Sequence, residues 1–279
     1  MRYLVLVSII WSFSFGIIKY ELTDVDNFFI SYSRNLIALI FFTSVSIYQF
    51  KKFKWDMQLI LIGAIQFGLM YIFYIQSYQY FEEGYGHLIA TFTITTPIFV
   101  SIADKYFFKN KFTYKECLAI FLVILGSYLM RYNVVNLRDY WHGFLLIQCA
   151  NFFFAFGQIL FKNWNKKNTN TNIVANFSQL FLGATLITFI SYLLFDTAST
   201  ELTETNKFFI LFLGLIASGI GFLLWNIGAI QVSSKRLAIM NNLVVPLAIL
   251  IFLTFWKEPI DFRLFLPGIA LFYIAYRIT

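Results

Sequence analysis

The chain has 279 residues, of which 59% are hydrophobic and only 13% are charged, and its formal net charge is +7. Soluble domains carry about 25% charged residues, so this composition, with a mean hydropathy of +0.72, excludes an ordinary soluble protein. A membrane-spanning helix uses about 20 apolar residues, and ten such helices would leave room only for short loops.

Ten apolar segments follow one another along the chain, and we predict that each is a transmembrane helix. The first has a basic flank, as signal peptides do, but it runs on without a small-residue cleavage site, so we expect it to be retained. The predicted fold class is an all-α integral membrane protein. The approximate spans are 3–20, 28–49, 57–80, 85–106, 114–131, 141–162, 173–195, 208–230, 236–256 and 261–277.

The second five segments repeat the pattern of the first five. Pro97 falls on Pro246, and at the same offset Gly126 falls on Ala275 without a gap. A unit of five spans is odd, so its two copies must cross the bilayer in opposite directions. Inverted repeats of this kind are typical of secondary transporters. We predict two inverted five-helix repeats, over residues 1–136 and 137–279.

Basic residues indicate the orientation. With the N-terminus inside, most lysines and arginines fall in the inner loops, whereas most acidic residues fall outside. The positive-inside rule therefore predicts that both termini lie in the cytoplasm, at the cell inner membrane. The lysines are spread over short turns rather than gathered in one patch, so the positive charge does not indicate a nucleic-acid partner.

Several segments together resemble EamA-type transporters of the drug/metabolite transporter superfamily. They are IIWSFSFGIIK (9–19), YSRNLIAL (32–39) with Arg34, ANFFFAFGQILFKNW (150–164), and residues 216–259 with Pro246 and Glu258. The sequence departs from the family pattern at His87, and at Lys109 where the repeat would place an acid. The resemblance implies ten helices around a central pathway, lined mainly by spans 1, 3, 4, 6, 8 and 9.

Polar side chains are concentrated in these same spans. Amides and hydroxyls are costly in hydrocarbon unless they face protein or a cavity, so we predict a substrate site there. Its predicted members are Trp11, Ser14, Tyr74, Thr91, Thr95, Asn151, Gln158, Trp225, Asn241 and Asn242.

Each of these residues also has a structural interpretation. Serine and threonine in a span often bond to their own helix, and amides often join helices together. Asn241 and Asn242 precede Pro246, which frees a backbone carbonyl nearby, as the broken helices of transporters do. Trp11 and Trp225 either line the pathway or belong to an interfacial aromatic belt.

Charged residues inside the spans are few. Lys19 and Arg34 lie near the outer ends of spans 1 and 2, where we favour snorkelling to the headgroups over a positive vestibule that attracts carboxylates. No acid lies in mid-span, which favours a uniporter, an exchanger or a carrier driven by the substrate gradient over ion coupling. His87 and His142 lie at span edges, where either can be an interfacial residue.

The sequence shows no catalytic, metal-binding or cofactor motif, and we predict a protein that is not an enzyme. A channel would require a filter or rings of charge, which are lacking, and a non-transporting subunit would not need polar inner faces. We predict a carrier that exports a small amino-acid-like metabolite by alternating access. The alternative is a larger cationic metabolite such as S-adenosylmethionine, held by cation–π contacts. Expected partners are the small-molecule substrate and membrane lipid, with the protein a monomer or homodimer.

Overall fold

The computed structural model describes the whole chain except residues 50–54, 83, 112, 131–139, 196–200 and 279. All regular structure in the described part is helical, which confirms the predicted all-α class. Eight helical stretches are long and apolar enough to cross a membrane. They are Arg2–Glu21, Asn27–Tyr48, Met57–Tyr80, Gly86–Phe108, Trp141–Lys167, Ile173–Phe195, Glu204–Gln231 and Ser234–Phe255.

The first half of the chain contains several spans built from more than one helical piece. The pieces are α1 (Arg2–Gly16), η1 (Ile17–Glu21), α2 (Asn27–Gln49), α3 (Met57–Gly63), η2 (Ala64–Leu69), α4 (Met70–Gln76), η3 (Ser77–Tyr80), α5 (Gly86–Thr91), η4 (Phe92–Thr95), α6 (Thr96–Phe108) and α7 (Tyr114–Leu129).

The second half of the chain is also a series of helical pieces, and some of its spans are again built from more than one piece. Its pieces are α8 (Trp141–Lys167), α9 (Ile173–Phe195), α10 (Glu204–Phe212), η5 (Leu213–Ile220), α11 (Gly221–Gln231), α12 (Ser234–Asn241), α13 (Val244–Phe255) and α14 (Phe262–Ile278). The predicted boundary between residues 136 and 137 lies outside the described residues, so the division into two repeats stays a prediction at that point.

The fourth and ninth spans are both interrupted, and each interruption lies beside its proline. Pro97 stands at the start of α6, directly after the 3₁₀ turn η4. Pro246 stands in the first turn of α13, after the turn that separates it from α12. Proline is tolerated in the first turn of a helix, where its missing N–H costs nothing, and cannot be accommodated deeper without a kink. The break that Pro246 indicated in the ninth span therefore occurs, and the fourth span is broken beside Pro97 as well.

Polar side chains mark where several helices begin. Asp56, Thr113, Thr203 and Ser233 each accept a hydrogen bond from the backbone N–H of the second or third residue of the following helix. Such caps satisfy N–H groups that have no partner within the helix. They fix the ends of the spans at positions close to those predicted from the apolar pattern.

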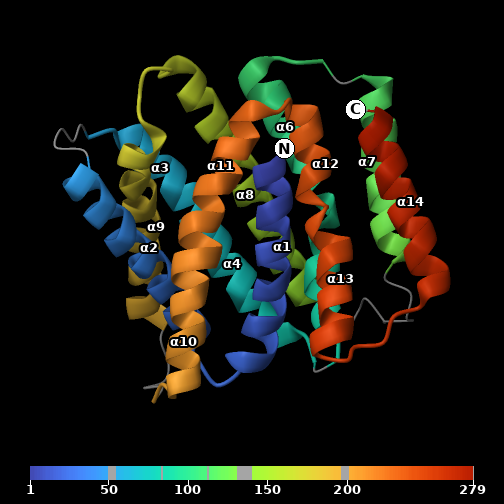
Figure 1. Cartoon of the computed structure of the whole chain (residues 1–279), viewed down its shortest axis with the longest axis horizontal. Helices are drawn as coiled ribbons and strands as arrows, with labels where there is room; N and C mark the ends of the chain where they lie inside the picture. Colours follow the sequence, from blue (N-terminus) through green and yellow to red (C-terminus); the bar gives the residue numbers. More distant parts are fainter. Residues whose placement is uncertain (50–54, 83, 112, 131–139, 196–200, 279) are drawn as a thin grey trace.

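Helices of the two halves pack against each other directly. α2 lies along α9, and α7 lies along α14 at the right-hand side of the molecule (Figure 1). α7 and α14, with 16 and 17 residues, are the shortest of the predicted spans. The two helices approach so closely at Gly126 that a Cβ there would lie 2.7 Å from the carbonyl oxygen of Gly268.

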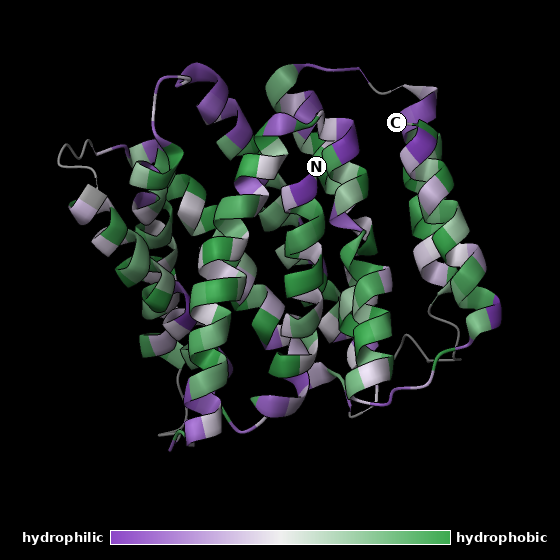
Figure 2. Ribbon diagram, viewed as in Figure 1, coloured by the Kyte–Doolittle hydropathy of each residue, from purple (hydrophilic) through white to green (hydrophobic). Residues whose placement is uncertain are grey.

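Both termini lie at the same edge of the molecule, at the top in Figure 1. We call this edge the terminal face and the other edge the opposite face. Apolar residues cover the middle of the helices, whereas polar residues gather near both edges (Figure 2). This distribution fits a bilayer between the two faces.

Candidate functional site

A cavity of about 100 Å³ lies between the two halves, in the middle of the helices. Most of its wall is apolar or aromatic, and helices of both halves contribute to it. Its lining residues are Trp11, Ser14, Phe15, Arg34, Met70, Tyr71, Tyr74, Thr93, Thr96, Ala150, Asn151, Phe154, Phe222, Asn241 and Val244.

Aromatic rings form one wall of the cavity around Trp11. Its ring meets Phe154 and Phe222 edge-on, with centroids 5.6 and 5.2 Å away. The indole N–H donates a hydrogen bond of 2.9 Å to the carbonyl oxygen of Ala217 on η5. Because its polar atom is already bonded to the second half of the chain, Trp11 offers a ligand mainly the face of its ring.

Arg34, on α2, is the charged residue of the cavity wall. Its Nε donates to Ser218 Oγ at 3.1 Å, and its Nη2 donates to the Tyr71 hydroxyl at 2.7 Å. Tyr71 also bonds to Ser218 at 2.9 Å, and the guanidinium carbon lies 4.3 Å from the centroid of the Tyr71 ring. The side chain is therefore held in one orientation by both halves of the protein.

The snorkelling interpretation of Arg34 is wrong. The residue is only 2% exposed, and its Nη1 is buried without a hydrogen-bond partner among the described residues. An arginine that reached the headgroups would be exposed at its charged end. Lys19 does stay near the opposite face, where its amine donates to the carbonyl of Phe81.

Amide side chains satisfy the carbonyls that the break in the fourth span sets free. Gln148 and Asn151 both donate to the Phe92 carbonyl at 3.1 Å. Asn242 donates to the Ile94 carbonyl at 2.9 Å. Backbone groups in a membrane interior must find such partners, so these amides hold the broken segment in place from α8 and from the turn before α13.

Asn151 can also accept a hydrogen bond from a ligand, besides holding the broken segment in place. Its Nδ2 bonds to Phe92 and to Thr95 Oγ1, whereas none of the described residues donates a hydrogen bond to its Oδ1. Because Asn151 lines the cavity, this oxygen remains an acceptor for a ligand.

A layer of buried polar side chains lies beyond the cavity, toward the terminal face. The Trp225 indole donates to Gln158 Oε1 at 2.9 Å, and Gln158 bonds to Asn241 at 3.4 Å. Gln66 and Asn226 form a second amide pair at 2.9 Å. Trp225 and Gln158 are both buried, and neither is among the lining residues, so both support the cavity from behind.

The structure thus divides the predicted site residues into two groups. Trp11, Ser14, Tyr74, Asn151 and Asn241 line the cavity. Thr91, Thr95, Gln158, Trp225 and Asn242 are not among the lining residues; they bond to backbone or to other side chains next to it.

Sequence reasoning left several lining residues out of the site. The aromatic residues Phe15, Phe154 and Phe222 carried no signal that sets them apart in a chain with 36 phenylalanines. Arg34 did carry one, because a charge inside a span is expensive and marks function by default. Its position near the end of the span favoured the other interpretation.

Comparison with known proteins agrees with the architecture. The model of the EamA-like transporter family matches residues 1–132 and 141–278. A crystal structure described only as that of a protein has a TM-score of 0.79 at 11% identity and covers 99% of this chain and 96% of that chain. A likeness at this identity shows the fold alone.

Relatives with similar sequences are named as transporters. The chain is 32% identical over 274 residues to a "Probable biotin transporter" of Pseudomonas aeruginosa, covering 97% of this chain and 93% of the relative. It is 30% identical over 270 residues to the "Biotin transporter" of Escherichia coli (strain K12), covering 96% and 89%. The chain, a multi-pass membrane transporter of a small molecule, therefore belongs to the EamA-like transporter family.

Proposed function

We propose that the chain is a secondary transporter of biotin, recognised as its carboxylate, across the cell inner membrane. The observation that carries the proposal is Arg34, a buried guanidinium in the cavity wall with one nitrogen unpaired. The names of the similar proteins suggest the identity of the substrate. The cavity itself supports a chemical class, a small molecule with one carboxylate and an apolar part that packs against the aromatic wall.

The charge of Arg34 supports an anionic substrate. A guanidinium stays protonated in proteins, and an uncompensated charge in a membrane interior is costly. Arg34 takes part in none of the ion pairs that the described residues form. A substrate carboxylate would supply the missing partner through charge-assisted hydrogen bonds.

The rest of the cavity suits the remainder of a biotin molecule. The aromatic wall of Trp11, Phe154 and Phe222 can pack against a fused, sulfur-containing ring system. The free Oδ1 of Asn151 can accept a hydrogen bond from the N–H groups of the urea. Sites of this kind combine apolar walls with a few polar groups that fix the orientation of the ligand.

The other substrate classes find less support. A cation such as S-adenosylmethionine would meet the unpaired guanidinium of Arg34 and be repelled. An amino acid would bring an ammonium group, for which the described lining residues offer no carboxylate. Export of an amino-acid-like metabolite thus remains an untested prediction that no contact in the cavity favours.

The proposed transport cycle is alternating access. The cavity lies between the halves, so a rocking of one half against the other would expose it to each side in turn. The buried acids among the described residues, Asp104, Glu116 and Glu258, lie near helix ends and away from the cavity. We therefore propose that the substrate gradient sets the direction of net transport.

Ligand-dependent stability of the purified protein tests the proposed substrate. Biotin should raise the apparent unfolding temperature, whereas its methyl ester, which lacks the negative charge, should have little effect. The variant Arg34→Gln should lose the response to biotin. Arg277→Gln, which changes an exposed arginine near the chain end, is the matched control and should keep it.

Two results would contradict the proposal. Equal shifts with biotin and with its methyl ester would show that the carboxylate is not recognised. A shift with amino acids and none with biotin would return the amino-acid-like class to first place.

A further inference from the structure

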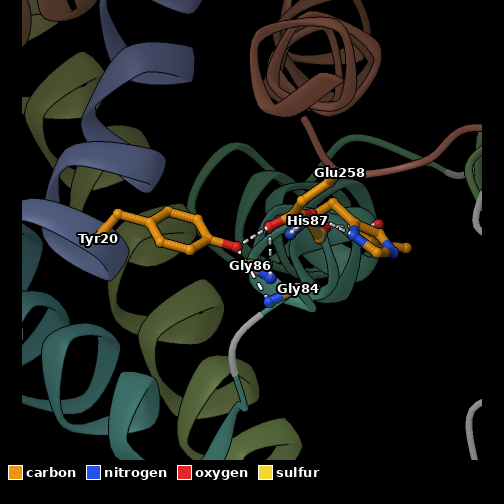
Figure 3. A network of polar contacts seen from close by, with 6 residues as sticks. Tyr20, Gly84, Gly86, His87 and Glu258 are labelled. Atoms are coloured by element: carbon orange, nitrogen blue, oxygen red, sulfur yellow. Dashed lines mark hydrogen bonds and ion pairs between the residues drawn. The ribbon is translucent and has the colours of Figure 1, made fainter. Parts of the chain in front are cut away.

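Three segments of the chain meet at the opposite face around one carboxylate, that of Glu258 (Figure 3). Tyr20 comes from η1 at the end of the first span, Gly84, Gly86 and His87 come from the start of the fourth span, and Glu258 follows α13. We call these residues the Glu258 cluster. Glu258 is 3% exposed and His87 is 8% exposed.

The carboxylate is hydrogen-bonded on both oxygens. Oε1 accepts from the Tyr20 hydroxyl at 2.5 Å and from the Gly86 N–H at 3.0 Å. Oε2 accepts from the His87 N–H at 3.1 Å and lies 2.5 Å from His87 Nδ1. His87 is therefore part of a buried network, which corrects its interpretation as an interfacial residue.

The backbone is shaped to bring these groups together. A Cβ on Gly86 would lie 2.6 Å from Phe252 Cε1 and 2.9 Å from Glu258 Oε1, so only glycine allows this approach. Lys257 adopts a left-handed conformation, with φ of 58°, which turns the chain back after α13. The N–H of Glu258 then bonds to the Phe252 carbonyl at 3.2 Å.

The cluster joins the two halves at their outer ends. His87 begins a span of the first half and Glu258 ends a span of the second, so the opposite face cannot open between them unless these bonds break. At the terminal face, Lys235 of α12 lies 3.5 Å from Glu116 of α7 and donates to Thr113 at 3.1 Å. Each face thus carries a polar contact between the halves.

The two contacts differ in how they respond to pH. Lysine and glutamate both stay charged around neutral pH. Histidine alone among these side chains gains or loses its charge between about pH 5 and 8. We propose that Glu258 and His87 form a proton-binding site, and that the proton bound there holds the opposite face closed.

Glu258 itself stays ionised throughout this range. Burial would raise the pKa of its carboxyl, but the hydrogen bonds from His87 and Tyr20 and the charge of His87 outweigh burial and lower it. A carboxylate with a lowered pKa loses its contribution only when the pH falls through that lowered value.

Other charged and titratable groups lie near the Glu258 cluster, but each of the following contacts is with a group other than the Glu258 carboxylate. Tyr85 lies beside the His87 ring, with centroids 6.5 Å apart. Glu21 accepts from the Trp256 indole at 3.3 Å, and Lys257 donates to the Thr254 carbonyl at 2.8 Å. On η1, Lys19 donates to the Phe81 carbonyl, and Asp261 caps the start of α14.

The sign of the effect follows from the hydrogen bond. Protonated His87 makes a charge-assisted bond to the carboxylate, which is stronger than the bond from a neutral imidazole. Loss of the proton as the pH rises leaves the weaker bond, so the opposite face opens more often. This proposal concerns access to the cavity, and it does not depend on the identity of the substrate.

Accessibility of the cavity from outside tests the proposal without measuring transport. A cysteine replaces Ser14 in a background without Cys117 and Cys149, and spheroplasts are treated with an impermeant thiol reagent at about pH 5.5 and about pH 8. Each labelling rate is divided by that of a cysteine at Asp24, which corrects for the pH dependence of the thiol. The ratio should rise about fivefold between the two pH values.

Three variants distinguish the cluster from other causes. His87→Gln should make the ratio independent of pH, and Glu258→Gln should raise it at both pH values. His142→Gln is the matched control, because that ring stacks on Tyr80 outside the cluster and its loss should leave the pH response unchanged. A pH response that survives in His87→Gln, a wild-type ratio that does not change with pH, or an unchanged ratio in Glu258→Gln would each overturn the proposal.

Discussion

Arg34 combines two features that rarely occur together in a membrane interior, a permanent charge and a nitrogen without a partner. Its bonds to Tyr71 and Ser218 fix the guanidinium but do not neutralise it. The free protein therefore holds a charge at a cost that a bound anion can offset. This arrangement is the physical basis for the proposed recognition of a carboxylate.

Two substitutions of Arg34 should distinguish the contribution of its charge to substrate affinity from that of its hydrogen-bond geometry. Arg34→Gln removes charge-assisted bonds that are worth about 1.5–3 kcal/mol, so substrate affinity should fall about 10- to 150-fold. Arg34→Lys keeps the charge but not the fork that reaches Tyr71 and Ser218, so its affinity should lie between the two. Binding of labelled biotin to purified variants measures this order. Equal affinity of Arg34→Gln and the wild type would remove Arg34 from the site.

Single residues were the least predictable level of this protein. Asn241 and Asn242 are neighbours, yet only Asn241 lines the cavity, because the turn after α12 directs Asn242 to the Ile94 carbonyl. Trp11 and Trp225 look alike in sequence, yet one faces the cavity and the other is buried behind it. Which way a side chain points beside a break depends on the tertiary contacts of both halves, and the sequence pattern carries no such information.

At the level of helices, the broken fourth span depends on amides that come from other spans. The carbonyl of Ile94 has its bond from Asn242, and the carbonyl of Phe92 has its bonds from Gln148 and Asn151. Pro246 indicated the break in the ninth span because the rule for proline is local, and Pro97, its counterpart in the repeat, lies beside the break in the fourth span. The partners of the freed carbonyls are distant in the chain, and no local pattern of residues indicates which amide bonds to which carbonyl.

The two neighbouring asparagines should therefore behave differently. Asn242→Ala leaves the Ile94 carbonyl without its bond and should reduce stability by about 1–3 kcal/mol, with the KM for substrate little changed. Asn241→Ala alters the cavity wall and should raise the KM with a smaller loss of stability. Thermal unfolding and transport kinetics on the same preparations measure both. A raised KM in Asn242→Ala at wild-type stability would show that this amide contacts the substrate.

The contact between α7 and α14 depends on small residues. A side chain at Gly126 would strike the backbone of Gly268, and overpacking of this kind costs about 1–3 kcal/mol. Gly126→Leu should lower the apparent unfolding temperature, whereas Phe121→Leu on the lipid-facing side of α7, where Phe121 is 59% exposed, should not. Equal stability of the two variants would mean that the helices can separate without cost.

For the whole molecule, the membrane class and the helical spans could be predicted because they rest on composition and apolar length. An even number of spans places both termini on the same side of the membrane. Both termini do lie at the same edge of the molecule (Figure 1), in agreement with the ten predicted spans. The positive-inside rule predicts that this edge faces the cytoplasm. The oligomeric state, monomer or homodimer, stays a prediction.

Orientation can be measured by labelling from the two sides of the membrane. A cysteine at Asp24 or Glu204 should react with an impermeant reagent in intact spheroplasts, whereas one at Lys166 or Lys235 should react only after lysis. The reverse pattern would place the terminal face outside and exchange the assigned sides of the two polar contacts between the halves.

Counterflow in proteoliposomes tests the central claim, that the chain carries an anionic substrate through a site that contains Arg34. Vesicles with the purified protein are loaded with unlabelled biotin and diluted into a trace of labelled biotin. The account predicts a transient accumulation of label that persists when a protonophore collapses the proton gradient and is lost in Arg34→Gln. Folded wild-type protein that accumulates no more label than empty vesicles, or an Arg34→Gln variant that accumulates as much as the wild type, would contradict it.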